Sequence, residues 1–252
     1  MRMKFLDEIA RKGPVFTFGE ALEVCKVRRE TLWTILSRLE KRGWIERIEK
    51  GKYMILPLGV RKGKYTLNEC VIGSMLVKPY SLSYWSALHF YGLTEQIPNI
   101  VFLQTTARKK DREFEIFGVE YRIVRIKKEK FFGIRREWME EKQINITDRE
   151  KTIIDCLDKP QYCGGIVEVA KALKNENFDA DILVDYAGKI GNSGVIRRLG
   201  YLCDILDIEI TLPKIETRNY LYLDPTMPKK GLKNARWKLM INLDEKTLGV
   251  LE

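Results

Sequence analysis

Apolar residues in the N-terminal segment recur at the three- and four-residue spacing of helices. Phe5 and Ile9 belong to a first stripe of this kind, which Gly13-Pro14 ends. Thr17 and Glu20 then match a capping box, in which a hydroxyl and a carboxylate bond the free amide groups of a helix start. The pattern therefore predicts two short helices before residue 26.

A third helix is predicted over residues 28–42. Its leucines and Ile35 form an apolar stripe, and Gly43 stands where helices often end in a left-handed turn. The stretch WIERIEKGKYMILP follows, with apolar residues in two runs, 45–48 and 53–56, around a polar turn. This pattern is typical of a two-stranded hairpin.

Three helices and a hairpin within about 57 residues are the layout of a winged helix-turn-helix. We therefore expect residues 1–57 to form a DNA-binding domain, in which the third helix enters the major groove. Arginine forks pair with guanine edges or phosphates, and hydroxyl groups can bond either. The candidate DNA-binding residues lie on the outward face of this helix and at the hairpin tip: Arg28, Arg29, Thr31, Trp33, Thr34, Ser37, Arg38, Lys41, Lys50 and Lys52. Trp33 lies off the apolar stripe, so it either packs against the wing or contacts DNA sugar.

The rest of the chain mixes helical and extended patterns. Asn68 is expected to cap a helix through Val77, and Ser81 another that ends at Gly92. The next stretch is extended, at 100–105 and then around a hairpin turn at Gly118.

Helical patterns dominate after residue 146. A second capping box, TDRE at 147–150, precedes an apolar helix. Further helices are expected over residues 166–174, 179–190 and 193–206, and a strand within 235–243.

The predicted fold class is α+β: an N-terminal winged helix-turn-helix followed by a larger mixed α/β C-terminal domain. Residues 58–67 have the composition of a linker, and residues 68–210 form the second domain. Residues 211–252 are a C-terminal extension, expected to contain a strand and to pack on that domain.

Charge points to a polyanionic partner. The chain has 45 Lys and Arg against 35 Asp and Glu, and residues 1–56 hold 13 of the basic residues against eight acidic ones. Nucleic acid is the first candidate partner and an anionic membrane surface the second. No apolar run is long enough to cross a bilayer, and the N-terminus does not read as a signal peptide, so a soluble cytoplasmic protein is expected.

The sequence makes no positive case for catalysis, a metal or a cofactor. The five cysteines, scattered without a C-x-x-C pair, are expected to be reduced thiols, and Gly164-Gly165 lacks the residues of a phosphate loop. His89 is the only histidine, and no partner for a triad stands near it in the sequence.

Two alternatives remain open. Asp148, Asp155 and Asp158 are able to hold magnesium in a metal-dependent nuclease, although helix capping and surface pairing explain them as well. A winged domain can also act as a scaffold that binds protein, with its charged helix face merely solvated.

Several stretches together resemble one family. YSLSYWSALHFYGLTEQIP (80–98), VFLQTT (101–106), ITDREKTIIDCLDKPQYCGGIVEVAKAL (146–173) and VIRRLGYLCDIL (195–206) follow the winged segment, which ends RGWIERIEKGKYMI. In this order they resemble the AbiEi-like antitoxins, the transcriptional regulators of type IV toxin-antitoxin and abortive-infection systems. One departure is the start of the third helix, where Arg28 and Arg29 replace the usual small polar cap.

The resemblance implies a non-enzymatic autorepressor that binds inverted repeats in its own promoter, as a dimer or as two cooperating copies. It also implies that the C-terminal domain supplies antitoxin activity against a nucleotidyltransferase-like toxin. In such systems neutralisation does not require a stable complex with the toxin.

Overall fold

The computed structural model describes residues 2–11, 14–56, 68–139 and 142–248. The chain divides into two compact units, residues 1–67 with 115–118 and residues 68–114 with 119–252. The predicted linker, residues 58–67, lies outside the described residues.

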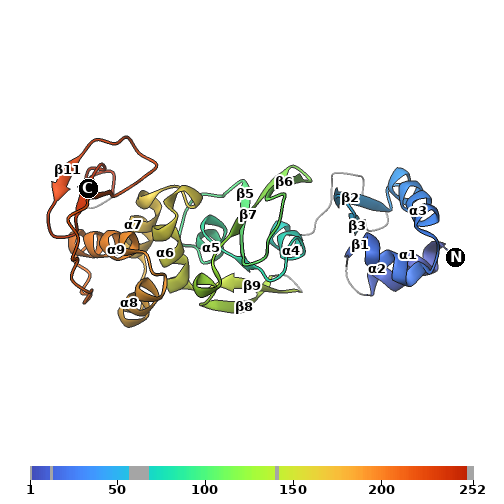
Figure 1. Ribbon diagram of the computed structural model, residues 1–252, viewed down its shortest axis with the longest axis horizontal. Coiled ribbons are helices and arrows are strands. Elements are labelled where there is room, and N and C mark those ends of the chain that lie inside the picture. The colour runs from blue at the N-terminus through green and yellow to red at the C-terminus, as the bar shows by residue number, and fades with distance from the viewer. Residues whose placement is uncertain (1, 12–13, 57–67, 140–141, 249–252) are drawn as a thin grey trace. The chain divides into compact units, whose positions relative to one another are not determined.

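In the first unit, three helices pack with a small antiparallel sheet (Figure 1). The strand order is β1-β3-β2, and Val15 pairs with Met54 in its register. Leu32, Leu36 and Leu39 are buried against the other two helices and the sheet, because their spacing places them on one side of the third helix. The elements are α1 (Arg2–Ala10), β1 (Val15–Thr17), α2 (Phe18–Cys25), α3 (Arg29–Lys41), β2 (Ile45–Glu49) and β3 (Lys52–Ile55).

This arrangement is that of a winged helix-turn-helix, as the sequence predicts. The capping box at the start of α2 is present: the Thr17 hydroxyl oxygen accepts from the Glu20 amide, and the Thr17 amide donates to the Glu20 carboxylate over 2.7 Å. Gly43 has the expected left-handed conformation, with φ of 70°. The sequence pattern misses β1, which adds a third strand to the predicted hairpin.

A six-stranded mixed sheet has the strand order β6-β7-β5-β4-β9-β8, and apart from residues 115 and 116 of β6 its strands belong to the second unit. β5 pairs in parallel with β7, and β4 pairs in parallel with β9. The predicted turn at Gly118 joins β6 to β7, with φ of 80°. The strands are β4 (Ser81–Leu82), β5 (Ile100–Thr105), β6 (Glu113–Ile116), β7 (Val119–Arg125), β8 (Ile134–Met139) and β9 (Lys142–Thr147).

Helix α6 is the centre of the second part of this unit. Residues 151–157 are all buried, and α5, α7, α8 and α9 pack around the helix (Figure 1). The buried positions include Lys151 and Asp155, whose charges are paired with each other inside the helix, as burial of charged groups requires. The helices are α4 (Glu69–Ser74), α5 (Trp85–Phe90), α6 (Arg149–Asp158), α7 (Ile166–Asn175), α8 (Ala180–Lys189) and α9 (Ser193–Ile205), with 3-10 turns η1 (Lys128–Lys130) and η2 (Pro160–Tyr162).

Three predicted helix boundaries in this unit are wrong. Ser81 does not cap a helix, because its backbone pairs with β5; α5 begins at Trp85 instead. The second capping box predicts Thr147 as the N-cap, and this is wrong because Thr147 ends β9. Asp148 is the N-cap of α6, and its carboxylate accepts from the Lys151 amide. The helix that Asn68 caps ends at Ser74, before the predicted Val77.

The C-terminal segment completes the second unit. The buried Asp224 carboxylate accepts from the Ile166 amide over 2.7 Å, which satisfies the start of α7. Arg198 of α9 donates to the carbonyl oxygens of Leu223 (2.8 Å) and Leu157 (2.9 Å), so its guanidinium joins this segment to α6. A small sheet contains β10 (Leu221–Tyr222), β11 (Leu232–Asn234) and β12 (Leu239–Ile241), of which only β12 falls within the predicted strand.

Candidate nucleic-acid interface

Helix α3 forms the centre of the candidate interface. Arg28 is its N-cap and, unlike a small polar residue at this position, makes no side-chain cap hydrogen bond. Arg38 and Lys41 lie in the last turn, where positive charge interacts favourably with the helix dipole. The helix therefore carries positive charge at its start and in its last turn.

The outward face of α3 is open to solvent. The buried leucine stripe turns the opposite side of the helix outward, as the sequence predicts. Nine of the ten candidate residues are exposed, and Lys52 is the exception. The exposed ones are Arg28, Arg29, Thr31, Trp33, Thr34, Ser37, Arg38, Lys41 and Lys50. One of the exposed hydroxyls is already used, because Thr34 donates to the Glu30 carbonyl oxygen over 3.1 Å.

An aromatic stack lies between α3 and the wing. The Trp33 indole stacks on the Phe18 ring with centroids 4.7 Å apart, and the Arg29 guanidinium lies 5.5 Å from the same ring centroid. The Phe18 amide donates to the Gly51 carbonyl oxygen in the turn between β2 and β3. Trp33 therefore packs on the first residue of α2, beside the wing turn.

In the part of the wing that the structure describes, Lys50 is the exposed lysine. Lys50 is exposed at the β2-β3 turn, and Gly51 has the positive φ of 76° that this turn requires. Lys52 is half-buried, and its ammonium lies 3.0 Å from the Glu49 carboxylate. Lys50 is therefore better placed than Lys52 to reach a phosphate.

The structure adds three exposed charged residues to this surface that the sequence-based list omits. Glu30 lies in the first turn of α3, Arg42 is the C-cap, and Arg47 is exposed on β2. Arg47 stands between the half-buried Glu46 and the buried Ile48, and a charged residue beside the apolar positions of a predicted strand is a signal that could have identified it. Glu30 is acidic, and a carboxylate can accept from cytosine in the major groove.

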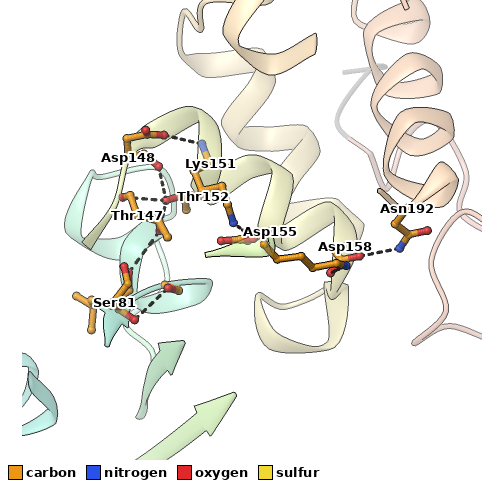
Figure 2. A network of polar contacts seen from close by, with 11 residues as sticks. Ser81, Thr147, Asp148, Lys151, Thr152, Asp155, Asp158 and Asn192 are labelled. Carbon is orange, nitrogen blue, oxygen red and sulfur yellow. Dashed lines mark hydrogen bonds and ion pairs between the residues drawn. The ribbon is translucent and has the colours of Figure 1, made fainter. Parts of the chain in front are cut away.

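The carboxylates considered for a nuclease are occupied by structural contacts. Figure 2 shows Asp155 directed at Lys151 and Asp158 at Asn192, and both carboxylates bond these partners. Asp158 also accepts from the Lys130 ammonium over 2.8 Å. The remaining carboxylate, Asp148, caps α6.

Burial dominates the electrostatics of these carboxylates. It raises the pKa of Asp155, although the nearby Lys151 ammonium lowers it. It also raises the pKa of Asp148 in spite of hydrogen bonds from the Lys151 amide and the Tyr186 hydroxyl. Within the described part of the chain, no group of three or more His, Cys, Asp and Glu side chains is arranged to hold a metal ion. The arrangement is that of a buried structural network.

The remaining sequence candidates have ordinary surroundings. His89 is exposed on α5, and Gly164-Gly165 forms a turn with φ of 79° and 90° before α7. The described cysteines are all free thiols; Cys156, Cys163 and Cys203 are buried, whereas Cys25 and Cys70 are half-buried. Among the described residues, no helix is both long and apolar enough to span a membrane.

The helical core, the three-stranded sheet and the exposed face of α3 define the first unit as a winged helix-turn-helix. Residues 4–55 match the family model described as "Transcriptional regulator, AbiEi antitoxin". The resemblance to AbiEi-like antitoxins is therefore confirmed for the winged segment, which gives the chain the module of a transcriptional regulator. A search of curated proteins finds no match to the chain.

Proposed function

We propose that the protein is a DNA-binding autorepressor and the antitoxin of a type IV toxin-antitoxin system. The observation that carries this proposal is the coincidence of two features in one segment. Residues 4–55 match an antitoxin regulator family, and the third helix of that segment exposes a basic face. The protein acts by binding, in the cytoplasm, without catalysis or a cofactor.

In this proposal α3 enters the major groove of double-stranded DNA. Arg28 reaches a base edge or phosphate from the helix start, since its side chain makes no cap hydrogen bond. Arg38 and Lys41 extend the contact along the helix, and Lys50 at the wing turn meets an adjacent phosphate. Inverted repeats in the promoter place two such helices about one helical turn apart, so a dimer or two cooperating copies bind.

The second unit supplies the antitoxin activity. Its sequence stretches at 80–98, 146–173 and 195–206 resemble those of the same antitoxins. The functional partner is a nucleotidyltransferase-like toxin encoded beside this protein. Neutralisation proceeds with or without a stable complex between the two.

A titration of the native promoter, followed by fluorescence anisotropy, tests the DNA-binding part. Arg28→Ala with Arg29→Ala removes two cations at the start of α3, and we expect a loss of about 1 to 3 kcal/mol for each base-specific fork. Lys229→Ala with Lys230→Ala is the matched control, because it removes the same charge from an exposed pair in the second unit. Equal losses in the two variants would count against α3 as the recognition helix.

Salt dependence gives a second measure of the same interface. Each lost phosphate contact reduces the slope of log K against log salt by about 1, because fewer counterions are released. Lys50→Ala should therefore flatten the slope and weaken operator and random DNA alike.

Growth of cells that express the neighbouring toxin tests the antitoxin part. We expect co-expression of the full chain to restore growth. The Arg28→Ala, Arg29→Ala chain should still do so if neutralisation resides in the second unit. Failure of the wild-type chain to restore growth would overturn this part and leave the DNA titration standing.

A further inference from the structure

A groove of about 670 Å³ lies within the first unit, beside the recognition helix. It is formed by α1, by the end of α2 and the turn after it, and by one side of α3. Its lining residues are Phe5, Glu8, Val24, Cys25, Val27, Glu30, Thr31, Thr34, Ile35 and Arg38. Its volume is within the range of sites that bind small molecules.

The groove runs along a single side of α3. Thr31, Thr34, Ile35 and Arg38 line it at the spacing that places helical residues on one face. Three of these four, Thr31, Thr34 and Arg38, also belong to the exposed surface proposed to bind DNA. An occupant of the groove would therefore contact the recognition helix itself.

The interior of the groove is largely apolar, and a few charged side chains stand at its edge. Phe5 and Ile35 supply apolar surface from opposite helices. In the described part of the chain, the Glu8, Glu30 and Arg38 side chains make no hydrogen bond or ion pair. The Glu8 carboxylate lies close enough to add to the effect of burial in raising the pKa of the Cys25 thiol.

The charge of the groove is opposite in sign to that of the whole protein. Among the lining residues that the structure describes, two carry carboxylates and one a guanidinium, whereas the chain has a formal net charge of +10. General attraction to the protein favours anions. A preference for a cation can therefore arise only from local contacts such as those with Glu8 and Glu30.

We infer that this groove binds a small molecule with an apolar body and a cationic group. The body covers the side chains of Phe5, Val24 and Ile35, and the cation lies against the carboxylates. The role of the ligand rests on the proposed function. The ligand competes with DNA, because both contact the same side of α3. The ligand would thus release the promoter.

Two apolar ions of similar shape and opposite charge test the ligand class. Tetraphenylphosphonium and tetraphenylborate are titrated into the full chain without DNA, and binding is measured by calorimetry. We expect the phosphonium to bind more tightly. Equal affinity, or tighter binding of the borate, would show that the carboxylates do not select the ligand and would overturn the inference.

Three matched variants locate the site. Glu8→Gln and Glu30→Gln each remove one groove carboxylate, and each should weaken phosphonium binding about two- to fivefold. Glu23→Gln removes the same charge from an exposed residue of α2 outside the groove, and it should leave binding unchanged. Unchanged affinity in both groove variants would overturn the site.

Competition is measured separately, with labelled promoter DNA. Saturating phosphonium should raise the Kd for DNA at constant ionic strength, and Glu8→Gln should reduce that effect. Ligand binding with no change in the Kd for DNA would overturn the competition. If the chain binds no promoter DNA at all, the proposed function fails, whereas the calorimetric result for the groove stands.

Discussion

The Trp33 indole stacks on the Phe18 ring, with centroids 4.7 Å apart and planes inclined by 29°. This contact joins the middle of α3 to the first residue of α2, whose amide also bonds the wing turn at Gly51. The aromatic pair is therefore one of the contacts that position the recognition helix relative to the wing, beside the α3 leucines that pack against the sheet.

Replacing Trp33 by Ala should lower the free energy of unfolding of the first unit by about 0.5 to 1.5 kcal/mol, because the aromatic pair is lost. Trp33→Phe keeps a ring on Phe18 and should retain most of that stability. Urea unfolding of the full chain measures both variants. A large loss of DNA affinity with unchanged stability in Trp33→Ala would show instead that Trp33 acts by touching DNA.

Glu30 should increase the preference of the basic surface for operator DNA over random DNA. It lies exposed on α3 among the candidate contacts, where its carboxylate repels phosphates. We expect Glu30→Gln to raise the affinity for random duplex DNA by roughly 0.2 to 1 kcal/mol and to reduce the ratio of operator to random binding. Glu23→Gln, which removes the same charge from α2, is the control. Unchanged binding to random DNA would place Glu30 away from the duplex.

The contributions of Lys151 and Asp155 to the free energy of unfolding should be strongly coupled, because the two side chains form a buried ion pair. Both are almost fully buried, and the Lys151 ammonium also lies 4.8 Å from the Phe132 ring centroid. Lys151→Met alone or Asp155→Leu alone should cost about 3 to 5 kcal/mol, because each leaves an uncompensated buried charge. The double variant should lose much less than the sum. Additive losses in urea unfolding would contradict this coupling.

Asp148 should make the stability of the second unit depend on pH. Burial raises its pKa, so the folded state binds the proton more tightly than the unfolded state does. Its contribution to the free energy of unfolding therefore increases as the pH falls from neutral toward the ordinary value of about 3.9. Asp148→Asn removes this titration and keeps a good helix cap.

We therefore expect the wild type to gain stability relative to Asp148→Asn between pH 7 and pH 5. Urea unfolding of both proteins at the two values measures the difference, and titration of all other groups cancels. A constant difference, or a gain by the variant, would contradict the raised pKa.

Local signals in the sequence account for most of the helices. The capping box of Thr17 and Glu20, and the leucine stripe of α3, involve residues within one or two turns of each other, so both can be recognised without a tertiary structure. The outward face of α3 follows from the same stripe. Helices α7, α8 and α9 begin and end within a residue of the predicted limits for the same reason.

Features that depend on distant contacts could not be predicted in this way. Ser81 has the residue type of a helix cap, but pairing with Gln104 places it in a strand. The β10 and β12 pair is parallel and joins residues that are far apart in sequence. The stack of Trp33 on Phe18 and the groove beside α3 likewise require several helices to come together, and no local pattern encodes them.

Attachment of the C-terminal segment should depend on Gly200. A Cβ atom at this position of α9 would overlap the Trp237 ring, whose Nε1 donates to the Asp204 carboxylate over 2.6 Å. Gly200→Ala must therefore displace Trp237, and we expect a loss of about 1 to 3 kcal/mol in the free energy of unfolding. Gly188→Ala on α8 meets open space and should instead stabilise the helix by about 0.5 to 1 kcal/mol. Urea unfolding followed by tryptophan fluorescence compares the two variants. If Gly200→Ala were as stable as Gly188→Ala, the packing of Trp237 on α9 would not hold the segment in place.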